Sequence, residues 1–211
     1  MKTLAWLALA VLSLAAPAGA SILEIADAHL DPRDSRVVHV EFAAGELSVI
    51  GTDDDRIHVE LTGECEHDRQ SCIDQAEPIR IVAQYASDAY HLRLEHTPHL
   101  TSNGPKLRLV VSVPRRLAVK VDMKAGDLTM RGLENDVDVD MSAGDVTLDM
   151  PEDAVRSVDV HVSVGDASLQ KPGADPEAEG WLGKRIRWNH GPGDAAVRIG
   201  LAAGDVNVRL K

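Results

Sequence analysis

The sequence predicts an all-β fold, a single-domain β-solenoid or β-helix-like stack of strand-corner-strand repeats. One short pattern occurs five times, apolar residues alternate with polar ones within each copy, and a glycine followed by an acidic residue lies in the middle of each copy. The copies are "VHVEFAAGELSV" (38–49), "VKVDMKAGDLTM" (119–130), "VDVDMSAGDVTL" (137–148), "VDVHVSVGDASL" (158–169) and "VRIGLAAGDVNV" (197–208). A match at every apolar position in all copies indicates a repeated structural unit.

Each copy predicts a strand, a corner and a second strand. Strict alternation is the period of a strand with one buried face. The glycine marks a tight corner because it adopts positive φ easily. The acidic residues that follow four of these glycines are expected to accept hydrogen bonds from nearby backbone; they are Asp127, Asp145, Asp166 and Asp205.

The spacing of the copies predicts that successive coils stack. Gly126, Gly144 and Gly165 are separated by 18 and 21 residues, which suits one solenoid coil each. Aligned residues then form ladders with a spacing of about 4.8 Å. The predicted inward ladders are Val40, Val121, Val139, Val160 and Ile199; Phe42, Met123, Met141, Val162 and Leu201; Leu47, Leu128, Val146, Ala167 and Val206; and Val49, Met130, Leu148, Leu169 and Val208.

An irregular β insert at 52–118 separates the first repeat (38–49) from the others (119–208). Its alternating runs predict four strands, "RIHVELTG", "IRIVAQYA", "YHLRLEH" and "LRLVVSVP". The run "KPGADPEAEG" at 171–180 is typical of a solvent-exposed loop. No long helix is predicted in the domain.

The first twenty residues, "MKTLAWLALAVLSLAAPAGA", are typical of a signal peptide. Lys2 precedes an apolar run that ends in a small-x-small cleavage motif. Cleavage leaves a domain at 21–211 without a membrane span, because no other run approaches the roughly 20 apolar residues that a spanning helix needs. We therefore expect an exported protein, periplasmic or extracellular.

Composition narrows the class of partner. The formal net charge of −12 argues against nucleic acid. Three Trp, two Tyr and one Phe are few rings for stacking against sugars or bases. In an exported chain, Cys65 and Cys72 predict a structural disulfide. A redox pair and half of a metal site are the alternatives.

The stretches "VVSVPRRLAVKVDMKAGDLTMRG" and "AAVRIGLAAGDVNVRL" resemble the adhesin-like β-strand-repeat family of unknown function, also called toastrack domains. The resemblance runs over roughly residues 36–210. It implies a solenoid in an exported or envelope-associated protein. The family is defined by its repeat and has no catalytic motif, so the resemblance implies little about mechanism.

The outward ladders hold the candidate binding surface. The candidate residues are four aspartates and a neighbouring histidine, namely Asp122, Asp138, Asp140, Asp159 and His161. Calcium prefers oxygen ligands of this kind. Two exposed charges about 5 Å apart repel by only about 0.8 kcal/mol in water, so a solvated acidic face without an ion is favoured.

No catalytic, metal or cofactor site is predicted. The chain has no G-x-S-x-G, no H-E-x-x-H and no P-loop. "GPGDAA" matches a loose dinucleotide pattern, but a strand instead of a helix follows it. In "HLRLEHTPH", His91 and His96 are expected to point to opposite faces of a strand.

These observations predict a non-catalytic exported protein that uses its acidic face to contact a protein or an envelope component. A polysaccharide-acting β-helix enzyme is one alternative, with Asp138, Asp140 and Asp159 as candidates. It requires two carboxylates roughly 5–9 Å apart across a cleft. A cation-binding solenoid is the other alternative.

Overall fold

Thirteen strands and two short helices build the computed structural model, which describes residues 21–65, 69–86, 88–97, 104–173, 178–180 and 183–211. The predicted signal segment 1–20 lies outside them. The elements are β1 (Ser21–Leu30), β2 (Val37–Thr52), β3 (Ile57–Cys65), α1 (Arg69–Ala76), β4 (Arg80–Ala86), β5 (Ala89–Glu95), β6 (Lys106–Pro114), β7 (Ala118–Arg131), β8 (Val137–Met150), the 3-10 helix η1 (Glu152–Ala154), β9 (Val155–Val164), β10 (Ala167–Gln170), β11 (Lys184–Trp188), β12 (Ala195–Ala203) and β13 (Val206–Leu210).

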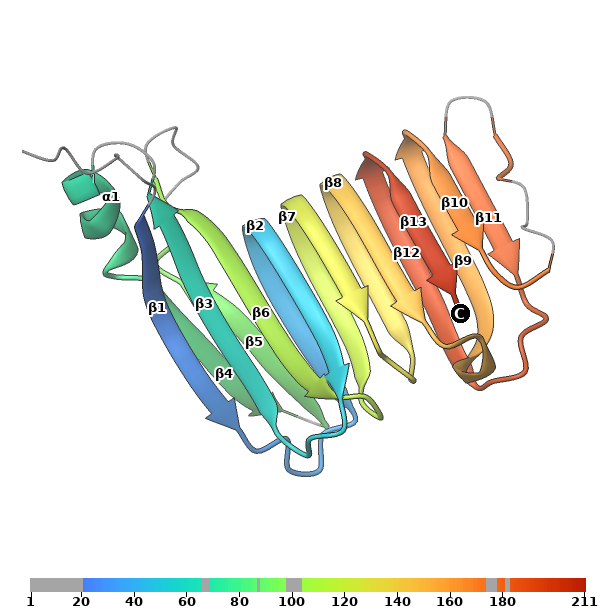
Figure 1. The fold of residues 1–211 in the computed structure, drawn as a ribbon, viewed down its shortest axis with the longest axis horizontal. Coiled ribbons are helices and arrows are strands. Elements are labelled where there is room, and N and C mark those ends of the chain that lie inside the picture. Colours follow the sequence, from blue (N-terminus) through green and yellow to red (C-terminus); the bar gives the residue numbers. More distant parts are fainter. Residues whose placement is uncertain (1–20, 66–68, 87, 98–103, 174–177, 181–182) are drawn as a thin grey trace, which may run out of the picture.

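The strands form one hydrogen-bonded sheet that folds over into two layers (Figure 1). Strands β2, β7 and β8 bend at a corner, so that each contributes a first arm to one layer and a second arm to the other. The first layer has the order β4-β5-β2-β7-β8-β12-β9-β11. The second layer has the order β1-β3-β6-β2-β7-β8-β13-β10. The predicted all-β solenoid is confirmed.

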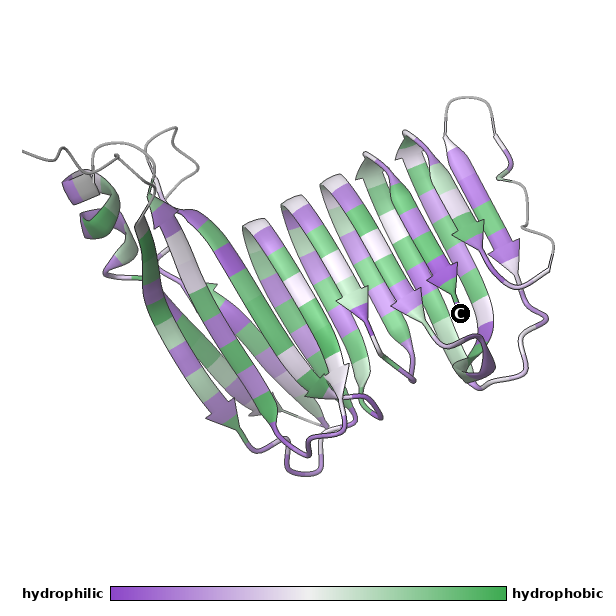
Figure 2. Ribbon diagram, in the orientation of Figure 1, coloured by the Kyte–Doolittle hydropathy of each residue, from purple (hydrophilic) through white to green (hydrophobic). Residues whose placement is uncertain are grey.

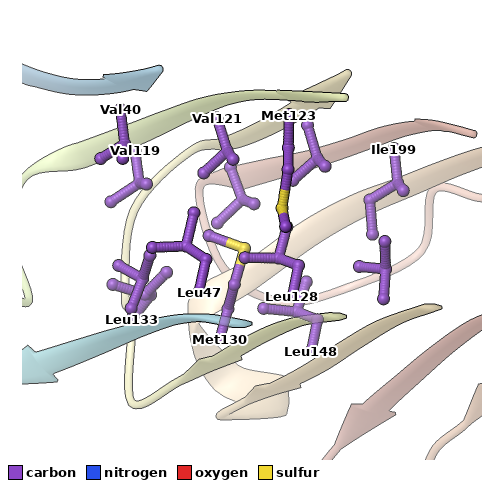
Figure 3. Close-up of a cluster of buried hydrophobic side chains, with 14 of the residues drawn as sticks. Val40, Leu47, Val119, Val121, Met123, Leu128, Met130, Leu133, Leu148 and Ile199 are labelled. Carbon is purple, nitrogen blue, oxygen red and sulfur yellow. The ribbon is translucent and has the colours of Figure 1, made fainter. Parts of the chain in front are cut away.

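The core lies between the two layers. Apolar and polar residues alternate along the strands (Figure 2), and the apolar ones point inward. Val40 and Val121 of the first arms and Leu47 and Met130 of the second arms point into one buried cluster (Figure 3). Every residue of the four predicted inward ladders is buried except Ala167, which is partly buried against the core. Burial of a Val or Leu side chain contributes about 1.5–3 kcal/mol, so these ladders supply much of the driving force for folding.

The corners depend on glycine. Gly45, Gly126, Gly144, Gly165 and Gly204 all have φ between +121° and +132°. A Cβ atom on Gly144 would lie 1.8 Å from the carbonyl oxygen of Gly126, and one on Gly204 would lie 1.8 Å from that of Gly144. Adjacent coils therefore approach too closely at the corner for any side chain.

Two of the four corner aspartates that were expected to accept hydrogen bonds from backbone, Asp145 and Asp205, do so. Asp145 Oδ1 accepts a hydrogen bond from the backbone N–H of Asp205 at 3.2 Å, and Asp205 Oδ1 accepts one from the N–H of Asp166 at 2.9 Å. The donors lie in the neighbouring coil, so these carboxylates link one coil to the next.

The expected stacking of coils in chain order is wrong for the last coil. In this coil the two arms are the separate strands β12 and β13. β12 pairs in parallel with β8 on one side and with β9 on the other. Thus Ile199 lies between Val139 and Val160. Pro151 and η1 connect β8 to β9, which is not the neighbour of β8 but the next strand but one in the first layer. After β11, which pairs with the far side of β9, the chain returns to form β12 between β8 and β9.

The insert forms the predicted strands, here β3 to β6, and one feature that the pattern did not predict, the helix α1. The predicted disulfide is confirmed: Cys65 at the end of β3 is bonded to Cys72 in α1, with a Cα–Cα distance of 5.9 Å. It fastens α1 to the end of the second layer (Figure 1).

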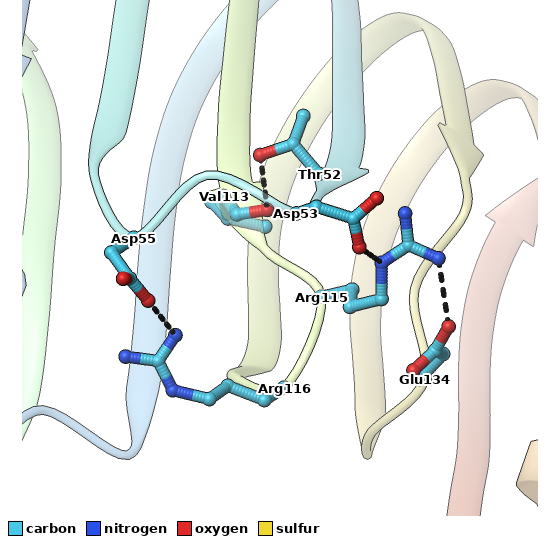
Figure 4. Close-up of polar contacts among 7 residues, drawn as sticks. All are labelled: Thr52, Asp53, Asp55, Val113, Arg115, Arg116 and Glu134. Atoms are coloured by element: carbon cyan, nitrogen blue, oxygen red, sulfur yellow. Dashed lines mark hydrogen bonds and ion pairs between the residues drawn. The ribbon is translucent and has the colours of Figure 1, made fainter.

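Ion pairs tie the strand ends opposite α1. Arg115 contacts Asp53 at 3.0 Å and Glu134 at 2.8 Å, and Arg116 contacts Asp55 at 3.1 Å (Figure 4). The hydrogen bond to Glu134 is the main cause that raises the pKa of Arg115 above its ordinary value. The contact with Glu134 links the insert to the regular coils, whereas the contacts with Asp53 and Asp55 lie within the insert.

Candidate functional site

The outer surface of the first layer, here the outer face, carries two rows of mainly charged side chains. They come from strand positions that alternate with the buried ones. Hydrogen-bonded register places the first row in the order His91, His39, Lys120, Asp138, Arg198, Asp159 and Arg187. The second row has the order Arg93, Glu41, Asp122, Asp140, Gly200, His161 and Arg185.

The structure brings three of the four predicted carboxylates together and separates the fourth. Asp122 and Asp140 are register partners, and Asp138 is on the same strand as Asp140. Arg198 lies between Asp138 and Asp159, because β12 is inserted there. The outer face is therefore mixed in charge and not the continuous acidic patch expected from chain order.

Two of these carboxylates already have basic partners. Asp159 lies 3.2 Å from Arg185 Nη2 and 4.0 Å from Arg187 Nε. Asp122 Oδ2 lies 2.5 Å from His39 Nε2 and 3.5 Å from Lys120 Nζ. His161 occupies the row position between Gly200 and Arg185. Carboxylates paired in this way are poorly suited to hold a shared calcium ion.

A shallow depression of about 470 Å³ lies on the outer face where the first arms approach their corners. It has apolar and polar walls, and its charged residues are of both signs. They are Glu41, Arg93, Asp122, Lys124 and Asp140. Such a surface is better suited to a ligand that is polar or carries charges of both signs than to a ligand that is uniformly basic.

Two histidine clusters were not predicted. His39, Glu41 and His91 form one, and Asp27, His29 and His58 form the other, each with its potential ligand atoms within 4.8 Å of one another. Neither cluster follows from the histidine-rich segment "HLRLEHTPH", in which His99 lies outside the described residues. A usable signal was present, because "VHVEF" and "YHLRL" carry histidine at the same position of the alternating pattern.

In the part of the chain that the structure describes, no helix is long and apolar enough to cross a membrane.

The folded-over sheet, its glycine corners and its open charged face define a β-solenoid repeat protein. The chain belongs to the toast-rack family, since the family model described as "N-terminal domain of toast_rack, DUF2154" matches residues 17–170. The match stops before β11, β12 and β13, which the structure places in the same sheet.

A solved structure with a similar fold supports this architecture. The chain is similar to a "putative cell adhesion protein" from Clostridium sporogenes, with 11% identity, a TM-score of 0.51, and 92% of this chain and 99% of that chain covered. A "putative adhesin" from Bacteroides fragilis has 11% identity and a TM-score of 0.31, over 90% of this chain and 96% of that chain. No curated protein matches the chain.

Proposed function

We propose that this protein is an exported, non-catalytic binding scaffold of the cell envelope or periplasm. Its outer face, around Asp122, Asp138, Asp140, Asp159 and His161, contacts another protein or an envelope component. The observation that carries the proposal is the outer face itself, a mostly parallel set of hydrogen-bonded strands that presents two rows of mainly charged side chains and a shallow depression. The similar structure from Clostridium sporogenes, a "putative cell adhesion protein", agrees with a binding role.

The arrangement of the carboxylates argues for binding over glycoside hydrolysis. Asp122 and Asp140 stand side by side on adjacent strands of one surface. Glycosidases place their two carboxyl groups on either side of the scissile bond, about 5–9 Å apart across a cleft. Arg198 also separates Asp138 from Asp159.

Export is tested by fractionation of cells that express the full chain, followed by N-terminal sequencing. The expected product starts at Ser21 and is found in the periplasmic or extracellular fraction. An unprocessed protein in the cytoplasm would contradict this part of the proposal.

The binding surface is tested by capture of crosslinked partners from the envelope extract of the source cells. The variant Asp138→Lys/Asp140→Lys reverses two exposed charges on the outer face. The control Glu24→Lys/Glu60→Lys makes the same charge change on exposed positions of the second layer. The expected result is a partner retained by the wild type and the control and lost with the outer-face variant. Equal recovery with both variants, loss with both, or no partner with the wild type would overturn the assignment.

A further inference from the structure

We propose that His39, His91 and Glu41 bind a divalent transition-metal ion of the zinc type on the outer face. Their potential ligand atoms all lie within 4.8 Å of one another. Two imidazoles and a carboxylate form a ligand set that suits zinc, whereas calcium and magnesium prefer oxygen ligands alone. This site adds a metal to the scaffold and does not depend on the proposed partner contact.

Strand register brings the three residues together. β2 and β5 run parallel, with His39 opposite His91 and Glu41 opposite Arg93. Residues i and i+2 of a strand lie on the same face, so Glu41 is beside His39 on the outer surface. The imidazoles therefore project from two hydrogen-bonded strands of the first layer.

The spacing of the two rings fits tetrahedral coordination. Nδ1 of His39 lies 3.2 Å from Nδ1 of His91, and the ring planes are inclined by 62°. With zinc–nitrogen bonds of about 2.0–2.1 Å, tetrahedral geometry places two nitrogen ligands about 3.3 Å apart. The metal-free pair can keep this spacing through one N–H···N hydrogen bond.

Asp122 orients His39 for this role. Its Oδ2 lies 2.5 Å from Nε2 of His39, whose side chain is only 14% exposed. A carboxylate only accepts hydrogen bonds, so His39 donates its Nε2–H, and in the neutral ring the lone pair is then on Nδ1, toward His91. Metal-binding histidines usually have such a carboxylate on the other ring nitrogen.

The basic side chains that lie opposite Glu41 and His39 in the strand register have partners of their own. Arg93, opposite Glu41, lies 2.9 Å from Glu95, and Lys120, opposite His39, lies 3.5 Å from Asp122. Glu41 is exposed, so an ion held by the three ligands keeps a coordination position open to solvent. Water or a donor from a partner can fill it.

The second histidine cluster is less suited to a metal. The rings of His29 and His58 are stacked, with centroids 4.2 Å apart and planes inclined by only 5°. Lone pairs lie in the ring planes, so those of stacked rings run parallel and do not converge on one point. Both rings also lie near Asp27 Oδ1, at 3.2 Å for His58 and 3.8 Å for His29. This cluster therefore serves as a matched control.

The test is a titration of the chelator-treated full chain with zinc chloride against a chromophoric competitor. The wild type is expected to bind one zinc ion per chain, with a dissociation constant in the micromolar range or below. Glu41→Gln and His91→Gln should each weaken binding at least tenfold. Asp122→Asn should weaken it by about 10–100-fold, the usual effect of losing a carboxylate behind a ligating histidine.

His29→Gln/His58→Gln should leave the affinity unchanged, and circular dichroism checks that each variant is folded. Substitution with Co²⁺ gives a second readout, since a tetrahedral site produces intense visible d–d bands that Glu41→Gln should alter. No binding by the wild type overturns the proposal. Binding that survives Glu41→Gln and His91→Gln, or that is lost only with the control variant, also overturns it. The partner variant Asp138→Lys/Asp140→Lys keeps all three ligands, so the two proposals fail separately.

Discussion

Gly144→Ala tests whether the corners require glycine. Gly144 has a φ of +121°, which costs an L-residue about 1–3 kcal/mol. Its new Cβ would lie 1.8 Å from the carbonyl oxygen of Gly126, whereas real Cβ atoms essentially never approach closer than 3.0 Å. Because that oxygen belongs to the backbone of β7, the clash is relieved only by parting β7 from β8.

Parting the strands at the corner removes one or two backbone hydrogen bonds, each worth about 1 kcal/mol. Strain and lost bonds together amount to about 2–5 kcal/mol, a large share of the roughly 5–15 kcal/mol that stabilises a typical protein. With a slope of about 2 kcal/mol per molar urea, a loss of 3 kcal/mol lowers the unfolding midpoint by about 1.5 M.

Gly200→Ala is the matched control, because Gly200 lies in β12 on the outer face. Its added Cβ would meet Val139 O at 3.8 Å and Asp140 Oδ1 at 3.9 Å, which is ordinary van der Waals contact. We expect no loss of stability, or a gain of about 0.4–1 kcal/mol from the reduced entropy of the unfolded chain. Urea unfolding followed by far-ultraviolet circular dichroism compares both variants with the wild type. Equal midpoints for the two variants would refute the argument about the corners.

Three further changes test the disulfide, the core and the inserted coil, all by the same urea assay. Cys65→Ser/Cys72→Ser should lower the free energy of unfolding by roughly 2.5 kcal/mol, and reduction of the wild type should have the same effect. Leu148→Ala should cost about 2–5 kcal/mol, because Leu148 is fully buried. A chain that stops after Asp194 lacks β12, which lies between β8 and β9, and β13, which lies between β8 and β10, so it should lose its cooperative transition. A cooperative transition in that shortened chain would contradict the inserted topology.

Periodicity predicted which residues face inward because burial imposes an alternation that sequence displays directly. Val40 and Val121 are in the core for that reason. Periodicity could not predict the order of the coils. The copies around Gly144, Gly165 and Gly204 share one apolar pattern, so any order of stacking buries the same faces.

The histidine cluster was missed for a related reason. The segment around His91 has no glycine corner, so it was not aligned with the segment around His39, although both carry histidine at the same position of the alternation. The ladder joins residues 52 positions apart, and no local pattern within one segment contains that information. The disulfide was predictable because the chain has two cysteines and its first twenty residues are typical of a signal peptide.

Charges on the outer face favour one stacking order over another even where both orders bury the same apolar side chains. In chain order, Asp138 would lie opposite Asp159, and two like charges would meet at strand spacing. With β12 inserted, Arg198 lies opposite both carboxylates. Opposite-charge pairs across strands contribute roughly 0.2–1 kcal/mol each, and like charges directly opposite each other are destabilising. This difference in free energy is small compared with the contribution of the backbone hydrogen bonds between strands. It still favours one order, because apolar burial is equal in both orders. The polar rows thus help to specify the topology, and the same insertion divides the acidic row that chain order alone would have made continuous.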